Sequence, residues 1–217
     1  MRCTGAGALH RLGKRAKVPA MDMSERFRGF LPVVVDLETG GFDPESNPIL
    51  EIAAVQVRFR GGRLEPADTW LRSVHPYPGG VLNPAALKVT GIDPLDPDRN
   101  AIAEADALRQ LFKQVRAATK EQGCQRAILV AHNAAFDQQF LNRALVRTNV
   151  KRSPFHPFSF IDTASLAAVA FGHTVLSEAC ARAEISFDKD QAHSALYDAE
   201  RTAELFCAVV NAWEARS

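Results

Sequence analysis

The sequence has little of what marks a secreted, membrane-bound or zinc-binding protein. Its 217 residues include only four cysteines, at positions 3, 124, 180 and 207, and no two of them form a CxxC pair. This spacing indicates neither a zinc site nor a disulfide framework, so we expect a reducing, cytoplasmic setting. No apolar run reaches the length that a bilayer requires, and we therefore expect no membrane contact. Internal repeats and low-complexity segments are also missing.

The chain as a whole carries almost no net charge. The formal value is +1, from 26 basic and 25 acidic residues. Residues 1–21 hold five of the basic residues and no acid, so the rest of the chain has 21 basic against 25 acidic residues, a balance of −4. Any site for a polyanion must therefore be a local patch. We expect residues 1–20 to be a disordered or upstream extension and residues 21–217 to form a single domain.

Apolar periodicity and turn residues predict strands first and helices later. We expect a mixed central sheet flanked by helices, which is an α/β fold. A turn at Gly61-Gly62 should join two strands of an antiparallel meander. The expected strands are 33–38, 50–59, roughly 70–75 and 127–131, and the expected helices are 84–89, 104–120, 134–148, 163–171, 175–184 and 194–213. An extended lead-in with its basic side exposed should precede the first strand, and residues 155–160 should form an aromatic loop.

Two carboxylates interrupt the first strand at its end. Asp36 and Glu38 follow three consecutive valines, and residues two apart in a strand point to the same face. Burying two like charges side by side is costly unless a cation neutralises them, and Mg²⁺ or Mn²⁺ prefers such oxygen ligands. The alternative is an acidic pair that faces solvent.

Two further segments carry acids near helix starts. Asp137 lies in the first turn of an expected helix. Its alternative role is that of a cap-region aspartate, whose negative charge interacts favourably with the helix dipole. His193 and Asp198 would diverge on one helix, but they converge if Ser194 is the N-cap and Asp198 points from the second turn. Their alternative roles are a surface histidine and an ion-paired aspartate. Asp162 we expect to cap its own helix.

Together these segments resemble a known family. Asp36, Glu38, Asp137, His193 and Asp198 match the DEDD exonuclease superfamily in its histidine-containing DEDDh branch, the 3′–5′ exonucleases with a ribonuclease H-like fold. Other motifs are similar to the ribonuclease T family within that branch, and they span residues 24–213. They are 26–30 (RFRGF), 50–54 (LEIAA), 83–84 (NP), 91–98 (GIDPLDPD), 131–137 (AHNAAFD), 154–158 (PFHPF) and 191–202 (QAHSALYDAERT).

The resemblance implies a two-metal hydrolase. Two Mg²⁺ ions per active site, or Mn²⁺ in their place, would be held by Asp36, Glu38, Asp137 and Asp198. His193 would be the general base that takes a proton from the attacking water. The implied product is a nucleoside 5′-monophosphate released from a 3′ end.

The resemblance also implies stacking of the terminal bases. Phe42, Phe136 and Phe158 match the family's base-stacking positions, although core packing is the alternative for any single phenylalanine. At Ala85 and Val89 the chain departs from the enterobacterial pattern, which has Glu and Phe there. We therefore expect a weaker or differently selective grip and reduced discrimination against 3′ cytosine.

A homodimer is implied as well, in which a basic patch of one subunit feeds the active site of the other. Arg26, Arg28, Lys120, Arg126 and Lys151 fall at or near that patch, and ordinary surface charge is their alternative role. The implied partners are RNA 3′ ends, namely tRNA and the precursors of 5S and 23S rRNA, and single-stranded or overhang DNA.

Three functions are therefore compared. The first is a 3′–5′ exoribonuclease for tRNA turnover and stable-RNA maturation that also degrades DNA ends. The second is a proofreading or repair exodeoxyribonuclease of the same superfamily, and the relative rate on RNA and DNA ends separates the two. The third is a catalytically inactive nucleic-acid-binding module, which the five filled catalytic positions argue against.

Overall fold

The computed structural model describes residues 22–215. The expected extension over residues 1–20 therefore lies outside the described residues. A five-stranded mixed sheet with the strand order β3-β2-β1-β4-β5 organises the chain. Its strands are β1 (Phe30–Thr39), β2 (Ile49–Arg60), β3 (Arg63–Ser73), β4 (Arg126–Ala131) and β5 (Phe155–Asp162). The α/β class with a mixed sheet is thus confirmed.

The sheet is antiparallel on one side of β1 and parallel on the other. β1 pairs antiparallel with β2 and parallel with β4, so it is the central strand. Gly61 and Gly62 join β2 to β3 with φ values of 60° and 82°, the pair of positive angles that a tight two-residue hairpin requires. The predicted meander is confirmed, and β3 begins seven residues earlier than the sequence indicated.

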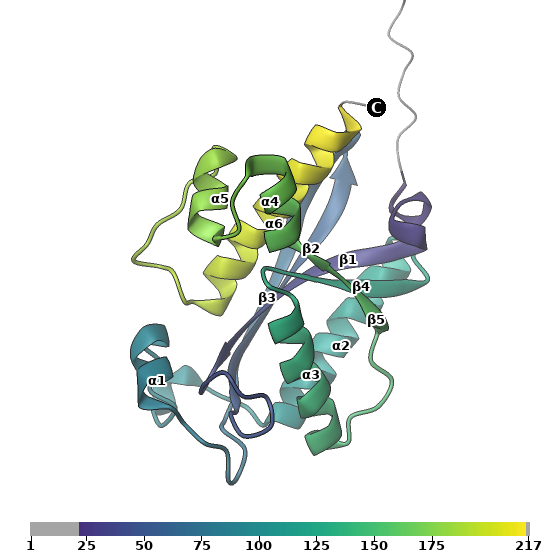
Figure 1. Ribbon diagram of the computed structural model, residues 1–217. Coiled ribbons are helices and arrows are strands. Elements are labelled where there is room, and N and C mark those ends of the chain that lie inside the picture. Colours follow the sequence, from purple (N-terminus) through teal and green to yellow (C-terminus); the bar gives the residue numbers. More distant parts are fainter. Residues whose placement is uncertain (1–21, 216–217) are drawn as a thin grey trace, which may run out of the picture.

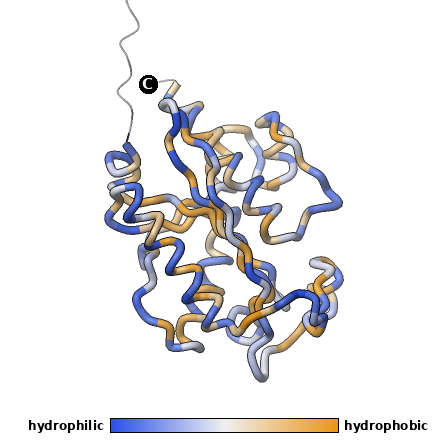
Figure 2. The backbone as a smooth tube through the Cα atoms, turned by 180° about the vertical axis from the view of Figure 1, so that it is seen from behind, coloured by the Kyte–Doolittle hydropathy of each residue, from blue (hydrophilic) through white to orange (hydrophobic). Residues whose placement is uncertain are grey.

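Helices cover both faces of this sheet (Figure 1). Helices α2 (Glu104–Glu121) and α3 (Ala135–Thr148) pack together on one face, and α6 (Ala195–Glu214) crosses β1, β2 and β3 on the other. Two short helices, α4 (Thr163–Phe171) and α5 (Leu176–Arg182), lie against α6. Figure 2 shows the apolar segments concentrated in the central strands, which form the buried core between the two helical layers.

A short helix stands apart from both layers. Helix α1 (Pro84–Thr90) starts with Asn83, whose side chain accepts a hydrogen bond from the Ala85 N–H, and with Pro84 in the first position. It ends at Gly91 in the left-handed conformation, φ 69°. The loop that follows contains one 3₁₀ turn, Pro97–Arg99.

Two sequence-based expectations about irregular segments are wrong. The lead-in to β1 is not extended: it forms two 3₁₀ turns, Met23–Glu25 and Phe27–Gly29, with positive φ at Phe27 and Arg28. The aromatic segment at residues 155–160 is not a loop but most of β5. Because β5 lies at the edge of the sheet, Pro157 can occupy it without removing a hydrogen bond from a further strand.

The expectation that no apolar stretch has the length of a membrane span also needs correction. By length and mean hydropathy, Thr163–Arg182 qualifies within the described chain, and 22% of its apolar 18-residue window is buried. The structure divides this stretch into α4 and α5, with Gly172 at φ 71° ending α4. A spanning helix needs about 20 continuous residues. Neither α4 nor α5 approaches that length, so the stretch is weak evidence for a membrane contact.

A buried ion pair ties α2 to α3. The Arg147 guanidinium donates two hydrogen bonds, of 2.9 and 2.6 Å, to the Glu104 carboxylate, whose side chain is 5% exposed. The same guanidinium lies 3.9 Å from the centre of the Tyr77 ring. Tyr77 in turn donates a 2.8 Å hydrogen bond to the carbonyl of Ser46, in the loop between β1 and β2.

We expect Arg147→Met to lower the free energy of unfolding by about 3–5 kcal/mol, because it leaves the Glu104 carboxylate buried without a partner. Urea unfolding followed by circular dichroism measures the change. Arg109→Met is the matched control, since Arg109 pairs with Asp106 at the surface of α2 and such pairs contribute about 0–1 kcal/mol. Equal losses in the two variants would contradict this account.

Candidate active site

A cavity of about 610 Å³ lies beside the C-terminal half of β1. We call it the strand-end cavity. It gathers residues from β1, the loop after β1, α1, the start of α3, the loop before α5 and the start of α6. Its lining includes Asp36, Glu38, Phe42, Ala85, Val89, His132, Phe136, Asp137, Thr174, His193 and Asp198. All four predicted metal ligands and the predicted general base are therefore in one place.

The first two carboxylates come from the central strand. Asp36 and Glu38 stand opposite Ala53 and Glu51 of β2, and the register of the two strands shifts just after Glu38. Such irregularities re-aim side chains near functional sites. Glu51 brings a further carboxylate close to Glu38, a contribution that the sequence analysis missed. Its position in the LEIAA motif was noted, but only the strand pairing reveals its proximity.

Asp137 is positioned by the turn before α3, and the Asp162 carboxylate stabilises this turn. Asn133 has φ 61°, and the Asp162 carboxylate accepts hydrogen bonds from the N–H groups of Asn133 (2.9 Å) and Ala134 (3.4 Å). The same carboxylate accepts the N–H of Ala164 at the start of α4, as the sequence predicted. Asp162 thus anchors the turns before α3 and α4, and Asp137 follows in the first turn of α3 with 3% of its surface exposed.

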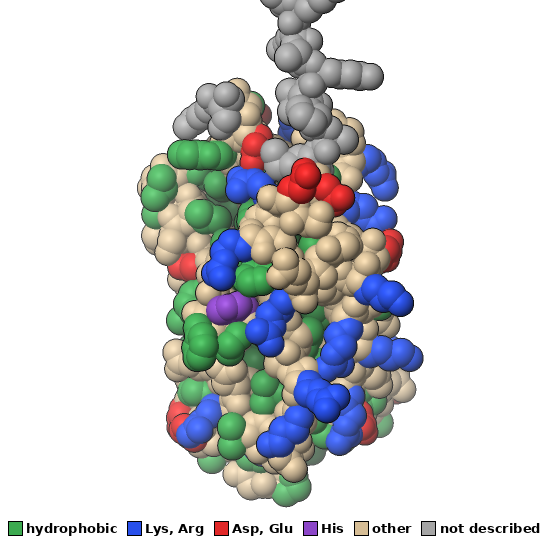
Figure 3. All heavy atoms as spheres, turned by 90° about the vertical axis from the view of Figure 1, so that its right-hand side faces the viewer, with side chains coloured by type: hydrophobic (Ala, Val, Ile, Leu, Met, Phe, Trp, Pro, Cys, Tyr) green, Lys and Arg blue, Asp and Glu red, His purple; other side chains and the backbone are tan. Residues whose placement is uncertain are grey.

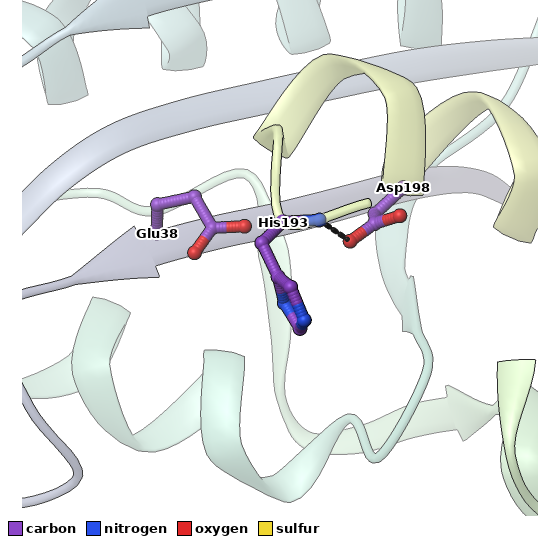
Figure 4. Close-up of side chains that lie close together, drawn as sticks. All are labelled: Glu38, His193 and Asp198. Atoms are coloured by element: carbon purple, nitrogen blue, oxygen red, sulfur yellow. Dashed lines mark hydrogen bonds between the residues drawn. The ribbon is translucent and has the colours of Figure 1, made fainter. Parts of the chain in front are cut away.

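His193 and Asp198 meet because α6 begins between them, as the sequence indicated. Ser194 is the N-cap residue of α6 by backbone conformation, although its side chain makes no capping bond, and Asp198 lies in the first turn rather than the second. The His193 N–H donates a 3.0 Å hydrogen bond to the Asp198 carboxylate. Figure 4 shows Glu38 reaching from the strand toward these two residues. Ligand atoms of Glu38, His193 and Asp198 all lie within 4.8 Å of one another.

Burial and mutual repulsion dominate the electrostatics. Burial, and then the charges of Asp137, Glu38 and Asp198, raise the pKa of Asp36 well above its usual value. Burial, with the charges of Asp198 and Glu51, raises the pKa of Glu38 to about 8. Burial also raises the pKa of Asp137 to about 8, against hydrogen bonds from its own backbone and that of Leu37. Without a positive charge among them, these carboxylates destabilise one another.

A divalent cation fits this donor set. The carboxylate oxygens are the ligands that Mg²⁺ and Mn²⁺ prefer, and they come from strand and helix positions that face one cavity. One Asp198 oxygen is buried and has no hydrogen-bond partner among the described residues, as expected for an atom that a metal ion completes. Metal binding is therefore consistent with the chemistry of the residues present.

The predicted stacking residues divide between two places. Phe42, with 82% of its surface exposed, and Phe136 both line the strand-end cavity, with ring centres 6.4 Å apart in an edge-on arrangement. Ala85 and Val89 line the same cavity, so the departures from the family pattern lie where they can affect a base. Phe158 is 88% exposed on β5 and does not line the cavity, and its role stays a prediction.

None of the predicted basic residues lines the strand-end cavity. Arg26 is half-buried and forms an ion pair of 2.7 Å with Glu214 near the end of α6, so it is not the free surface charge that an exposed lead-in would provide. Arg28 lies 5.1 Å from the centre of the Phe30 ring. Arg126 and Lys151 are exposed near β4 and β5. Figure 3 shows many Lys and Arg side chains on one face of the molecule.

His132 is a cavity residue to which the sequence analysis gave no role. Its ring nitrogens lie 2.9 Å from the Thr163 hydroxyl and 2.7 Å from the Thr174 carbonyl. It therefore joins the end of β4 to the start of α4 and to the loop that forms one cavity wall. Burial lowers its pKa, which favours the neutral ring. Its sequence signals were its place at the end of a buried strand and its place in the motif at residues 131–137.

Comparison with known proteins supports the same interpretation. A family model described as exonuclease matches residues 33–206. The chain is 53% identical over 192 residues to ribonuclease T of Marinobacter nauticus, covering 88% of this chain and 87% of the relative. It is 54% identical over 197 residues to ribonuclease T of Hahella chejuensis, covering 90% of each, and 53% identical over 193 residues to that of Escherichia coli K12, covering 88% and 90%.

Solved structures share the fold. The nuclease domain of 3′hExo, a DEDDh family member bound to rAMP, aligns with a TM-score of 0.66 at 22% identity, over 85% of this chain and 92% of that one. Escherichia coli Exonuclease I in complex with a dT13 oligonucleotide aligns with a TM-score of 0.66 at 17% identity, over 86% of this chain and 42% of that one. At these identities the likeness concerns the fold.

The raised carboxylate pKa values predict how stability depends on pH and metal. The folded protein keeps protons on Glu38 and Asp137 up to about pH 8, whereas the unfolded chain releases them near its ordinary values of 4.5 and 3.8. The free energy of unfolding of metal-free protein should therefore fall as pH rises through this window. A bound cation should stabilise the protein most at the upper end, where the carboxylates are ionised.

Thermal unfolding in EDTA and in Mg²⁺, at low and high pH within that window, measures the effect. We expect Mg²⁺ to raise Tm more at high pH, with about 2–4 °C for each 1 kcal/mol. The double variant Glu38→Gln, Asp137→Asn is the control and should lose most of this difference. A Tm increase that is independent of pH in the unsubstituted protein would contradict the electrostatic account.

Proposed function

The chain belongs to the ribonuclease T family of DEDDh 3′–5′ exoribonucleases, and from this premise we propose that it trims RNA 3′ ends with the residues of the strand-end cavity. The single observation that carries the proposal is the convergence of Asp36, Glu38, Asp137, His193 and Asp198 on one cavity. They come from β1, α3 and the start of α6, which lie far apart in the sequence. The same convergence argues against a catalytically inactive binding module.

The superfamily uses divalent metal ions, and we propose two Mg²⁺ ions, with Mn²⁺ as a substitute, held by Asp36, Glu38, Asp137 and Asp198. Such ions stabilise the attacking and the leaving oxygen of a phosphodiester when they are bound. The unpartnered Asp198 oxygen and the raised pKa values of the other three carboxylates support this ligand set.

His193 acts in this proposal as the general base. It takes a proton from the water whose oxygen attacks the last phosphodiester, and the bond from phosphorus to the 3′ oxygen of the preceding nucleotide breaks. The products are a nucleoside 5′-monophosphate and an RNA shortened by one nucleotide. The exposure of His193 and its closeness to Glu38 and Asp198 support the role, because an accessible ring can pass the proton to solvent.

The substrate lies, in this proposal, with its terminal base against Phe42 and Phe136. Phe158 contacts a base outside the cavity. Aromatic stacking holds any base by its π face and suits an enzyme that must accept many 3′ ends. We propose tRNA and the precursors of 5S and 23S rRNA as substrates, single-stranded or overhang DNA as a further one, and the cytoplasm as the setting. The proposed active form is a single exonuclease domain over residues 21–217, assembled as a homodimer.

The basic residues are proposed to contact RNA away from the reacting end. Arg28, Arg126 and Lys151 are exposed, while Arg26 is proposed to act mainly by holding the lead-in against α6 through Glu214. Because phosphate contacts release counterions, binding should weaken steeply with salt.

A timed digestion of a short RNA with a 3′ overhang tests the proposed chemistry. We expect stepwise loss of 5′-monophosphates from the 3′ end in Mg²⁺ and none in EDTA, and parallel reactions on DNA measure the preference for RNA. Asp36→Asn should abolish hydrolysis, and His193→Asn should lower kcat by roughly 10²–10⁴-fold because it removes the general base. Asp68→Asn, an exposed aspartate on β3, is the matched control. Unchanged hydrolysis by Asp36→Asn would refute the assignment.

The valine at position 89 leads us to predict an altered preference for the 3′-terminal base. With Val89 in place of an aromatic ring, one stacking contact worth about 1–3 kcal/mol is absent, and discrimination against 3′ cytosine should be reduced. Rates on oligomers ending in C and in A measure the discrimination, and Val89→Phe should increase it. Val81→Phe, which also adds a ring at an exposed valine but lies outside the cavity lining, should leave it unchanged. Full discrimination against 3′ cytosine by the unsubstituted protein would contradict the effect proposed for Val89.

A further inference from the structure

A second cavity, of about 310 Å³, lies between α2, α3 and β5. We call it the α3 cavity. It begins on α3 at Gln138, one residue after Asp137, but it shares no lining residue with the strand-end cavity. Its lining is Phe112, Arg126, Leu129, Gln138, Leu141, Asn142, Leu145, Arg152, Ser153, Phe155, His156 and Pro157. Of these residues, the function proposed above uses Arg126 alone, as an exposed RNA contact, and it gives the cavity itself no role.

The floor of the α3 cavity is apolar. Phe112, Leu129, Leu141 and Phe155 are buried, and Leu145 closes one side. A volume of 310 Å³ is at the lower end of the range for small-molecule sites, about 300–1,000 Å³. The cavity therefore suits a single flat ring system with an apolar face better than a long or branched ligand.

The rim of the α3 cavity carries polar side chains that are available to bind a ligand. Gln138 and Asn142 are four residues apart on α3, so their side chains project from the same side of the helix. Among residues 22–215, no hydrogen bond or ion pair engages the side chains of Gln138, Asn142, Arg126 or Arg152. An amide group presents both a donor and an acceptor, the combination found on the edge of a nucleobase.

An aromatic side wall is held in a fixed orientation. The His156 Nδ1 atom accepts hydrogen bonds from the N–H groups of Phe158 (3.2 Å) and Ser159 (3.0 Å). The ring centre of His156 lies 5.3 Å from that of Phe30 and 6.1 Å from that of Phe158. Phe30 is buried and supports the His156 ring from inside. His156 thus links the α3 cavity to exposed Phe158, on whose ring a base can stack.

The surroundings favour a negatively charged backbone. Within residues 22–215, no Asp or Glu lines the α3 cavity or the adjoining groove, which shares Arg126 with it and also holds Arg116 and Lys120. The Arg116 guanidinium donates a hydrogen bond to the carbonyl of Arg152 and holds the turn at the mouth of the cavity. Figure 3 shows Lys and Arg side chains spread over this face of the molecule.

We propose that the α3 cavity binds one unpaired nucleobase of the RNA substrate, upstream of the nucleotide that is removed. This inference rests on the proposed function, since it concerns the same RNA. The apolar floor takes the face of the base, the amides of Gln138 and Asn142 contact its edge, and Arg126 and Arg152 contact the neighbouring phosphates. Unpaired RNA bases are recognised in this manner, by stacking and by contacts to their edges.

Equilibrium binding of short single-stranded RNA, measured by fluorescence anisotropy in EDTA so that no hydrolysis occurs, tests the proposal. The RNA is compared with a series in which one nucleotide at a time is abasic. We expect one upstream abasic position to weaken binding roughly tenfold, the loss of one stacked base. Two variants should weaken binding of intact RNA: Leu145→Phe, which fills the cavity, and Asn142→Ala, which removes an edge contact. In both, an abasic nucleotide at that upstream position should cause no further loss of affinity.

Gln139→Ala is the matched control, because Gln139 is an exposed amide on α3 that does not line the cavity. It should bind every RNA of the series as the unsubstituted protein does. Two results would overturn the proposal. In the first, no upstream position has an abasic penalty that changes in Leu145→Phe or Asn142→Ala. In the second, Gln139→Ala weakens binding and removes the penalty as those two variants do. Failure of the proposed function is seen separately, as absence of metal-dependent shortening of intact RNA by the unsubstituted protein.

Discussion

The structure depends on one unfavourable interaction, the crowding of buried and half-buried carboxylates in one cavity. Asp36 and Glu38 are set by the pleat of the central strand, and Asp137 and Asp198 face them from helices on opposite faces of the sheet. Glu51 adds a further charge from the neighbouring strand. A fold that only had to be stable would have paired or dispersed these groups. Their assembly is useful only if cations occupy the space between them.

The other features of the site keep the carboxylates in place against their repulsion. Asp162 anchors the turns before α3 and α4, and the backbone N–H of His193 anchors Asp198. His132 ties the end of β4 to the wall formed by Thr174. These contacts use backbone groups as partners. A positioned backbone donor fixes a carboxylate without adding a competing cation, so the charge remains available for metal ions.

The convergence of the four carboxylates on one cavity was predictable because these residues follow local rules. Alternation along a strand places Asp36 and Glu38 on one face, and N-terminal helix positions explain Asp137 and Asp198. The errors arose where tertiary contacts decide. Pro157 is typical of a loop, but it lies in an edge strand, where a proline is tolerated. Arg26 was expected to be an exposed charge, but it pairs with Glu214, which lies 188 positions later in the sequence. Glu51 and His132 needed strand pairing and helix placement, which no spacing in the sequence reveals.

The most direct test of the central claim is a crystal structure of the protein soaked in Mn²⁺, with data collected for the anomalous scattering of manganese. The account predicts two anomalous peaks in the strand-end cavity, each within coordination distance, about 2.0–2.6 Å, of oxygens from the set Asp36, Glu38, Asp137 and Asp198. Ordered manganese elsewhere, with those four carboxylates bound to no ion, would contradict it.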